Sequence, residues 1–322
     1  MIAVFLVQRV LSAVPTLLLL SMISFAFISL APGDAVSAMV DPTAATDPER
    51  LSAERARLGL DQPLPVRYVR WLGSVLQGDF GHSALARRPV REILFERLPA
   101  TIRLGLVALV VAVTVGVSAG IVSALRQYSA VDHVVSLASY AAYSLPNFFI
   151  GLVAIYVFAV HLRWLPSSGA ATPGAPPSVI DTARHLVLPV LALSVQFIGI
   201  YARQTRSAML ETLRADHVRT ARAKGLREAT VTLKHVLRNG LIPVVTIVGL
   251  NLPLLITGAI VTEVVFSWPG MGALTVSAIY GRDYPVIMGV VLVIGIVVIA
   301  TNLLVDLLYA VVDPRVDYVG RA

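Results

Sequence analysis

The sequence predicts an all-α polytopic membrane protein with six transmembrane helices and an outer helical insertion after the first span. Composition is the first reason: of 322 residues, 57% are hydrophobic and only 14% are charged. The mean hydropathy of +0.79 is the second. The third is that the apolar residues gather in six runs without lysine or arginine in their interiors. A water-soluble domain does not sustain that pattern, whereas a helical membrane protein requires it.

The apolar runs differ in length. Three are about as long as a bilayer requires, one is longer and is expected to tilt, one is short, and the last continues past an acidic residue. In chain order the runs are Val10–Ala31, Leu104–Leu125, Val134–Val160, Leu186–Ala202, Leu241–Thr262 and Val286–Val305. A cleaved signal peptide is the alternative for the first run. Its length and the lack of a clear small-x-small cleavage site favour a retained span.

The basic residues set the expected orientation. Nine lysines and arginines and only three acidic residues lie between Arg203 and Arg238. The positive-inside rule therefore places this short loop in the cytoplasm, and six spans then place both termini there as well. The segment Pro32–Arg103 carries ten arginines against nine acidic residues, but a segment this long crosses largely regardless of charge. Because the basic excess is local, it argues against nucleic-acid binding.

The runs divide the chain into four parts. These are the N-terminus with the first span (1–31), an extracytoplasmic helical segment (32–103), a five-helix transmembrane core containing the cytoplasmic loop 203–240 (104–312), and a cytoplasmic tail (313–322). Apolar spacing in the second part predicts short amphipathic helices at Pro63–Leu76 and Pro89–Leu98. Asp47 as an N-cap, with Glu and Arg spaced along the residues that follow, predicts another at Pro48–Leu58. Packing over the outer ends of the spans is favoured for them over a ligand site. The stretch Pro166–Ser178 is expected to lack regular structure.

The cytoplasmic loop holds the most informative pattern. Val218 and Ala221 fall on one side of a short predicted helix, and Arg219 and Arg222 fall on another. Gly225 follows where a helix C-terminus favours a positive φ. Such a helix suits docking into a cleft of another protein, or lying on anionic lipid. The pattern alone leaves both open.

The residues of this loop resemble a known motif. Arg219 to Leu226 reads R-T-A-R-A-K-G-L, and His235, Leu237, Arg238, Asn239 and Pro243 follow at the matching places. This resembles the EAA loop of binding-protein-dependent ABC importer permeases, in the oligopeptide, dipeptide, glutathione and nickel branch. Further matches are Ala31–Asp34, Leu58–Leu64, Gln77–Gly81 and Phe266–Gly272.

The resemblance implies a B-type permease subunit in a bacterial or archaeal cytoplasmic membrane. It would import peptides; nickel, glutathione or another small solute is the alternative cargo. The expected partners are a homologous C-type permease subunit, two ABC ATPase subunits on the cytoplasmic face and an extracytoplasmic binding protein. No catalytic residue and no cofactor are expected in this chain, since ATP and Mg would be bound by the ATPases.

The resemblance also implies that the short helix of this loop, here called the coupling helix, would contact the ATPases. Its residues are His217, Val218, Arg219, Thr220, Ala221, Arg222, Ala223, Lys224, Gly225 and Leu226. Arg219, Arg222 and Lys224 would supply polar contacts. Val218 and Ala221 would fill a groove of the ATPase, and Gly225 would allow the turn.

Other sites are expected at the outer loops and within the spans. Trp268, Pro269, Gly270 and Met271 are candidates for contact with the binding protein, with a membrane-interface anchor as the alternative. Asn147 and Asn251 are candidate pathway-lining residues, because the neighbouring Pro146 and Pro253 bend their helices. Kinked packing without any pore role is equally consistent with these residues. Glu263 and Asp306 are expected near a membrane boundary, wetted and structural.

Other functional classes find little support. The chain has no cysteine, no histidine pair at metal-ligand spacing and no phosphate-binding G-x-x-x-x-G-K-[ST]. Its single G-x-S-x-G, Gly116–Gly120, lies inside the apolar run Leu104–Leu125 and not in a strand-to-helix elbow. A stand-alone secondary transporter would need ion ligands near the midplane, and no convincing set occurs. An intramembrane enzyme is disfavoured for lack of a catalytic constellation.

Overall fold

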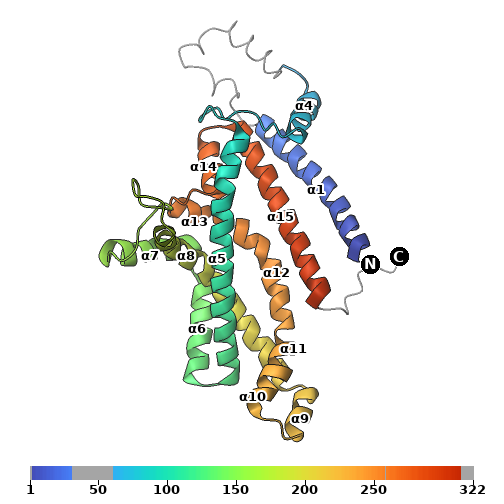
Figure 1. Ribbon diagram of the computed structural model, residues 1–322, viewed down its shortest axis with the longest axis vertical. Helices are drawn as coiled ribbons and strands as arrows, with labels where there is room; N and C mark the ends of the chain where they lie inside the picture. Colours follow the sequence, from blue (N-terminus) through green and yellow to red (C-terminus); the bar gives the residue numbers. More distant parts are fainter. Residues whose placement is uncertain (1, 31–60, 258, 313–322) are drawn as a thin grey trace. The chain divides into compact units, whose positions relative to one another are not determined.

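The computed structural model describes residues 2–30, 61–257 and 259–312 (Figure 1). Over these residues the regular structure is helical, and the extended backbone is limited to one isolated bridge between His82 and Pro89. The chain separates into two compact units. The first comprises residues 1–101 and 269–300, and the second comprises residues 102–268 and 301–322.

The first unit holds α1, α4, the first turns of α5, α14 and most of α15. Their bounds are α1 Ile2–Leu30, α4 Leu64–Leu76, α5 Val90–Leu125, α14 Met271–Tyr280 and α15 Tyr284–Val312. The second unit holds the rest of α5 and of α15 and the helices between α5 and α14. These are α6 Ala130–Ser144, α7 Asn147–Ala154, the π-helix η1 Ile155–His161, α8 Val179–Leu213, α9 Asp216–Ala223, α10 Glu228–Thr230, the π-helix η2 Val231–Leu237, α11 Arg238–Gly240, α12 Ile242–Thr257 and α13 Ala259–Val265.

The predicted all-α membrane fold is confirmed. Within the described ranges, four helices are long and apolar enough to cross a bilayer: Val7–Leu30, Val90–Leu125, Val179–Leu213 and Tyr284–Leu307. Two bent helix pairs pass the same test when each pair is taken together, which brings the spans among the described residues to as many as six.

The third apolar run is not the single tilted span that its length predicts. It forms two helices, Ala130–Ser144 and Asn147–His161, which meet at 104°. Leu145 is extended, with ψ at 133°, because the ring of Pro146 excludes the residue before it from the helical region. The carbonyl of Pro146 then accepts the N–H of Phe149 and begins the next helix. The predicted proline kink is therefore a complete break.

The fourth and fifth runs also extend beyond their predicted ends. α8 continues to Leu213, so the first third of the predicted cytoplasmic loop is helix. The fifth run is preceded by Glu228–Gly240, which joins Ile242–Leu255 with a bend of 41°. α12 itself passes through Pro253 to Thr257.

The outer segment follows the predictions in part. The helix expected at Pro63–Leu76 is confirmed as α4, which Pro63 precedes. The prediction of a separate short helix at Pro89–Leu98 is wrong. Residues 90–98 form the first turns of the long helix α5, which continues without a break. The helix expected at Pro48–Leu58 lies outside the described residues. Pro166–Ser178 has no helix or strand, as expected.

A tight loop before α5 anchors the first unit. Gly78 and Gly81 have φ of +84° and +82°, and the carboxylate of Asp79 accepts the N–H of Gly81. The ring of Phe80 packs against a buried cluster formed by Val90, Leu94, Met271, Ala278, Val286 and Val290. Two glycines that reach the left-handed region therefore let the loop turn its aromatic side chain into the core.

The second unit is organised around α8, which is largely buried by its neighbours. Glycines allow the close approach. A Cβ on Gly116 or Gly120 of α5 would lie within 3 Å of the backbone of α8, and a Cβ on Gly199 of α8 would lie 2.8 Å from the carbonyl of Ser139 in α6. Small residues commonly let helix backbones approach in membrane proteins.

Replacing Gly120 with alanine should destabilise this packing. The new Cβ would meet the Ala202 carbonyl oxygen at 2.5 Å, and backbone atoms cannot move aside cheaply. We expect a loss of about 1–3 kcal/mol, seen as a lower melting temperature of the detergent-purified chain. Gly73→Ala in α4, where the Cβ meets nothing within 4 Å, is the matched control and should be neutral or slightly stabilising. Equal melting temperatures of the two variants would contradict this packing.

Candidate functional site

The loop helix predicted from the sequence forms as α9, Asp216–Ala223. Asp216 lies in its first turn and Arg222 in its last, which suits the helix dipole at both ends. Gly225 adopts φ +76°. Its N–H donates to the Arg222 carbonyl, and the N–H of Leu226 donates to the Ala221 carbonyl. These two bonds form a Schellman motif, so the predicted C-terminal role of Gly225 is confirmed.

One side of α9 is buried against this chain. Val218 is fully buried and Ala221 is 4% exposed. Both belong to a cluster whose other buried members are Ala124, Met209, Val231 and Val236. The expectation that Val218 and Ala221 fill a groove of an ATPase is therefore wrong. The sequence shows that this side is apolar but not that α8 and η2 cover it.

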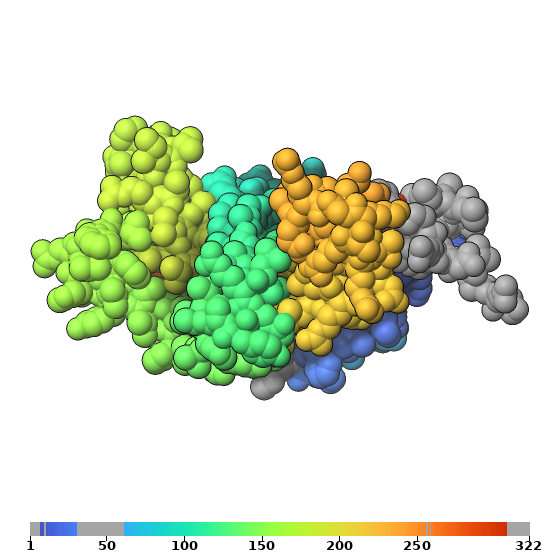
Figure 2. All heavy atoms as spheres, turned by 90° about the horizontal axis from the view of Figure 1, so that it is seen from below, coloured from blue at the N-terminus to red at the C-terminus, as the bar shows by residue number. Residues whose placement is uncertain are grey.

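The other side of α9 is exposed. Its exposed residues are His217, Arg219, Thr220, Arg222, Ala223, Lys224, Gly225 and Leu226. Leu226 is 41% exposed, and Leu233 of η2 is 67% exposed. This end of the second unit therefore presents a basic surface with apolar side chains in it. In Figure 2 it is the yellow and orange surface beside the green α5–α6 turn.

Ion pairs shape the exposed surface. The Arg222 guanidinium binds the Glu228 carboxylate through both Nε and Nη2, with Nη2 2.6 Å from Oε1. This carboxylate raises the pKa of Arg222. Arg219 lies 3.6 Å from Asp216 but remains mostly exposed. Arg222 therefore holds the turn after α9, whereas Arg219 remains available to a partner.

Two parts of the sequence motif meet in space. His217 Nε2 lies 3.3 Å from the Asn239 amide nitrogen, which also donates to the His235 carbonyl at 3.0 Å. The imidazole thus ties α9 to η2 and α11. His235 and Asn239 belong to the sequence motif, but the sequence does not predict this contact, because both residues lie well beyond α9 along the chain.

A hollow lies beside α9. It has a volume of about 370 Å³ and lies between the C-terminal ends of α5 and α8 and the Arg222–Glu228 pair. Its other lining residues are Ala124, Leu125, Gln127, Leu210, Leu213, Arg214 and Thr232. A partner that contacts the exposed side of α9 could also insert a side chain here.

The candidate pathway residues lie on different helices. Asn147 is the first residue of α7, directly after the break, and its buried Oδ1 has no hydrogen-bond partner among the described residues. Asn251 is half-buried on α12.

The outer-loop candidates are not surface residues. Trp268 and Met271 are fully buried, Gly270 is buried, and Pro269 is half-buried. The backbone N–H of Trp268 donates to the Glu263 carbonyl, and that of Met271 donates to Thr101 Oγ1. The expectation that Trp268 and Met271 contact a binding protein is therefore wrong, because both side chains are fully buried. The expected wetting of Glu263 is also wrong, since its side chain is fully buried.

The described residues contain no group of three or more His, Cys, Asp or Glu side chains that could hold a metal ion. The exposed side of α9 is carried by a helical membrane scaffold.

The comparisons with known proteins identify this scaffold. Residues 116–318 match the family described as binding-protein-dependent transport system inner membrane component, and residues 1–105 match the N-terminal part of such components. The chain belongs to this family. It is therefore a multi-pass inner-membrane permease subunit that works with ATPase and substrate-binding components.

The curated relatives match along nearly the whole chain. A Brucella suis protein, whose name assigns it provisionally to the peptide permeases, is 46% identical over 96% of this chain and 97% of its own length. The oligopeptide transport system permease protein AppB of Bacillus subtilis is 40% identical over 98% and 100%. The dipeptide transport system permease protein DppB of Escherichia coli K12 is 38% identical over 98% of each chain.

Solved structures share the fold. A chain of the methionine ABC transporter MetNI aligns with a TM-score of 0.56 at 18% identity, covering 69% of this chain and 96% of the other. A chain of an amino acid ABC transporter aligns with a TM-score of 0.53 at 11% identity, covering 68% and 94%. These likenesses support the fold of the permease.

Truncating Val218 should loosen α9. Val218→Ala removes buried methyl groups from the cluster with Met209 and Val236, and we expect a loss of about 1–2 kcal/mol. Leu233→Ala removes more atoms from an exposed position and should cost less. Thermal unfolding of the purified chain measures both variants. The burial of Val218 would be contradicted if Leu233→Ala were the more damaging change.

Proposed function

We propose that this permease subunit imports di- or oligopeptides, driven by ATP hydrolysis on partner subunits. Relatives named as peptide permeases align with nearly the whole chain, which supports this cargo. The partners would be a homologous C-type permease subunit, two ABC ATPases and an extracytoplasmic binding protein. ATP and Mg would be bound by the ATPases, with no cofactor in this chain. Nickel or glutathione transport by the same architecture is the alternative.

The observation that carries the coupling role is that α9 is buried on one side and exposed on the other. Its buried side packs against α8 and η2, while its exposed side offers Arg219, Thr220, Lys224 and Leu226. A force applied by an ATPase to the exposed side would therefore reach α8 and the segment leading into α12. Coupling of this kind requires that the ATPases contact α9 differently in their two nucleotide states.

The orientation follows from the same surface. If the ATPases bind at α9, the basic loop between α8 and α12 is cytoplasmic, in agreement with the positive-inside rule. With six spans, both termini are then cytoplasmic.

Replacing Gly225 with valine should abolish uptake while membrane insertion persists. A Cβ at Gly225 meets nothing within 4 Å, so the damage comes from φ +76°, which costs a β-branched residue about 1–2 kcal/mol and reshapes the end of α9. The effect is measured as the uptake of a labelled dipeptide by cells, divided by the amount of the variant found in their membranes. Gly225→Asn should retain more uptake, because asparagine tolerates this region.

Gly174→Val is the matched control. Gly174 has φ +77° and equally open surroundings, but it lies in the loop before α8. It should retain uptake. Equal loss of uptake in both valine variants, or loss of insertion in Gly225→Val, would contradict a specific role for the α9 turn.

Cargo is tested by deleting the gene for this chain. We expect loss of dipeptide and oligopeptide uptake, restoration by the wild-type chain, and unchanged nickel and glutathione uptake. Loss of nickel or glutathione uptake with normal peptide uptake would overturn the peptide assignment and leave the permease assignment standing.

A further inference from the structure

A short loop and a turn form a knob beside the start of α5. The loop comprises residues 83–87, and the turn comprises residues 280–283 between α14 and α15. Both belong to the first unit, where α14 and the starts of α5 and α15 come together (Figure 1). A Cβ on Gly281 would collide with the side chain of Leu85, so the loop is seated directly on the turn. These two segments are called the knob below.

The knob is held in one shape from beneath. The carboxylate of Asp283 is 2% exposed and accepts the Ser83 hydroxyl. The same carboxylate accepts the backbone N–H groups of Ala84 and Leu85. Within the loop, the Ser83 carbonyl accepts the N–H of Arg87 at 3.0 Å. The loop therefore keeps its shape without the help of another protein.

Two arginines of the knob have a backbone conformation that arginine rarely adopts. φ is +52° at Arg87 and +54° at Arg282, in the left-handed region that suits glycine. Both residues are exposed, and neither makes an ion pair with a described residue. Arg88 differs from them, because its guanidinium binds Glu92 and Glu96. Strained backbone persists only where the surrounding structure fixes it, and it is common at binding sites.

Apolar side chains stand beside these two charges. Tyr280 is 86% exposed, Leu85 is 58% exposed and Ile279 is 56% exposed. Tyrosine and arginine are enriched among the residues that contribute most to binding between proteins. The knob thus combines a preformed shape, two unpaired positive charges and an exposed aromatic ring. This combination suits a protein surface that carries carboxylates beside an apolar recess.

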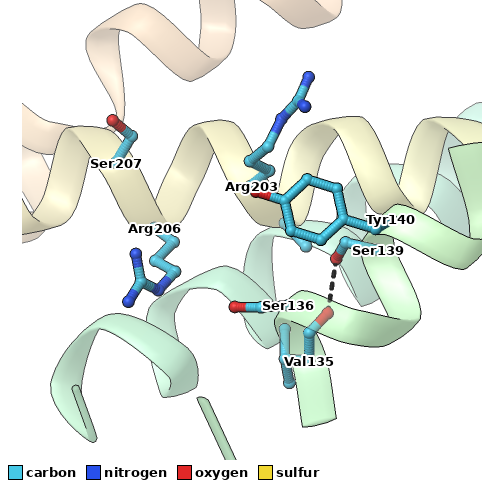
Figure 3. Close-up of a pocket in the computed structure, with 8 residues that line it drawn as sticks. Val135, Ser136, Ser139, Tyr140, Arg203, Arg206 and Ser207 are labelled. Atoms are coloured by element: carbon cyan, nitrogen blue, oxygen red, sulfur yellow. Dashed lines mark hydrogen bonds between the residues drawn. The ribbon is translucent and has the colours of Figure 1, made fainter. Parts of the chain in front are cut away.

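The polar pocket between α6 and α8 lacks this combination. There Arg206 donates from Nε and Nη2 to the two carboxylate oxygens of Asp132, at 2.6 and 2.7 Å. Arg203 also borders the pocket, but Figure 3 shows its guanidinium pointing away from Arg206. The residues that line this pocket therefore direct no free positive charge into it, whereas the knob presents two.

The charges along α5 place the knob outside the hydrocarbon layer. Val90 begins α5 and lies 14 residues, or about 21 Å, before Leu104, where the apolar run of this helix starts. The turns between them carry Arg91, Glu92, Glu96, Arg97 and Arg103. A tilt of about 40° would still leave roughly 16 Å along the bilayer normal.

This distance favours a protein over lipid as the partner of the knob. The headgroup layer is only about 5–8 Å thick on each side of the hydrocarbon, so the knob extends beyond it. The apolar first turns of α15 lie next to the knob, but Val286 and Val290 are buried in the cluster with Val90 and Leu94. Fluid headgroups also adapt to any arrangement of basic side chains and gain nothing from a strained, fixed loop.

We propose that the knob docks onto an acidic surface of the extracytoplasmic binding protein. Carboxylates of that protein would pair with Arg87 and Arg282, and an apolar recess would receive Tyr280. With six spans, three lie between the knob and α9, so the knob is extracytoplasmic when α9 faces the cytoplasm. This inference rests on the proposed function, from which the partner is taken, and it does not depend on the cargo.

Affinity measurements on the whole transporter complex in nanodiscs test the proposal. The probe is the purified binding protein that becomes crosslinked to the wild-type complex in native membranes. Arg87→Glu should weaken its affinity about tenfold or more, because an attractive charge pair becomes a repulsive one. Binding to the wild type should also weaken as the salt concentration rises. If Arg87→Glu fails to assemble, Tyr280→Ala replaces it and should show a loss in the same direction.

Arg163→Glu is the matched control. Arg163 is exposed and has φ +55°, but it lies after η1 and outside the knob. This variant reverses the same charge on the same kind of backbone, and it should bind the probe as tightly as the wild type does.

Four results would overturn the proposal. Unchanged affinity in both knob variants is the first, and an equal loss in Arg163→Glu is the second. The third is binding that requires phosphatidylglycerol in the nanodisc, which would assign the arginines to lipid headgroups. The fourth is dissociation of the second permease subunit from Arg87→Glu with affinity for the probe unchanged, which would assign Arg87 to a subunit contact.

The proposed function fails by different results. Absence of any crosslinked binding protein would contradict the proposed partner, and the docking surface with it. Dipeptide uptake is scored separately, so a complex that binds the probe through the knob but takes up no dipeptide would count only against the cargo.

Discussion

The close approach of neighbouring helices to α8 is the constraint on which the second unit depends. The backbone of α8 lies so near to α5 and α6 that a single Cβ at Gly116, Gly120 or Gly199 would collide with a carbonyl oxygen or a neighbouring carbon. In a bilayer the helices gain little from the hydrophobic effect, so close van der Waals packing must hold them. Because α8 also carries Arg206 and Met209, it fixes both the Asp132 ion pair and the cluster beneath α9.

This arrangement gives the proposed coupling role of α9 a structural basis. α9 has only eight residues and would be marginal by itself. It is held by three separate means: the buried cluster around Val218, the His217–Asn239 contact and the Arg222–Glu228 ion pair. The buried cluster excludes water and contributes most, whereas an exposed ion pair is worth little alone. The result is a helix rigidly joined to the scaffold on one side and open to a partner on the other.

The sequence predicted features that depend on local chemistry. The turn at Gly225, the helix after Pro63 and the irregular loop before Ser178 follow from φ preferences, apolar spacing and composition, and each was confirmed. The sequence alone does not predict which residues cover an apolar side chain, because the covering residues lie far away along the chain. The apolar side of α9 therefore predicts a partner for Val218, although α8 and η2 bury this residue.

The errors at Pro146, Pro89 and Trp268 have related causes. A proline in a run of bilayer length indicates a kink, but packing decides whether the helix bends or breaks by 104°. Proline is favoured at the start of a helix, so Pro89 correctly indicates where a helix begins. It does not indicate the length of that helix, which continues to Leu125. An aromatic residue in a turn suits an interface, yet Trp268 is fully buried.

The measurement that tests the account most directly uses the absence of cysteine from the chain. Thr220→Cys places one thiol on the exposed side of α9, and Ala221→Cys places one on the buried side. A membrane-impermeant maleimide should label Thr220→Cys in inside-out vesicles stripped of ATPases, and bound ATPases should block that labelling. Ala221→Cys should remain unlabelled in both conditions. Labelling of Thr220→Cys in right-side-out vesicles, or labelling that the ATPases leave unchanged, would contradict the coupling role of α9.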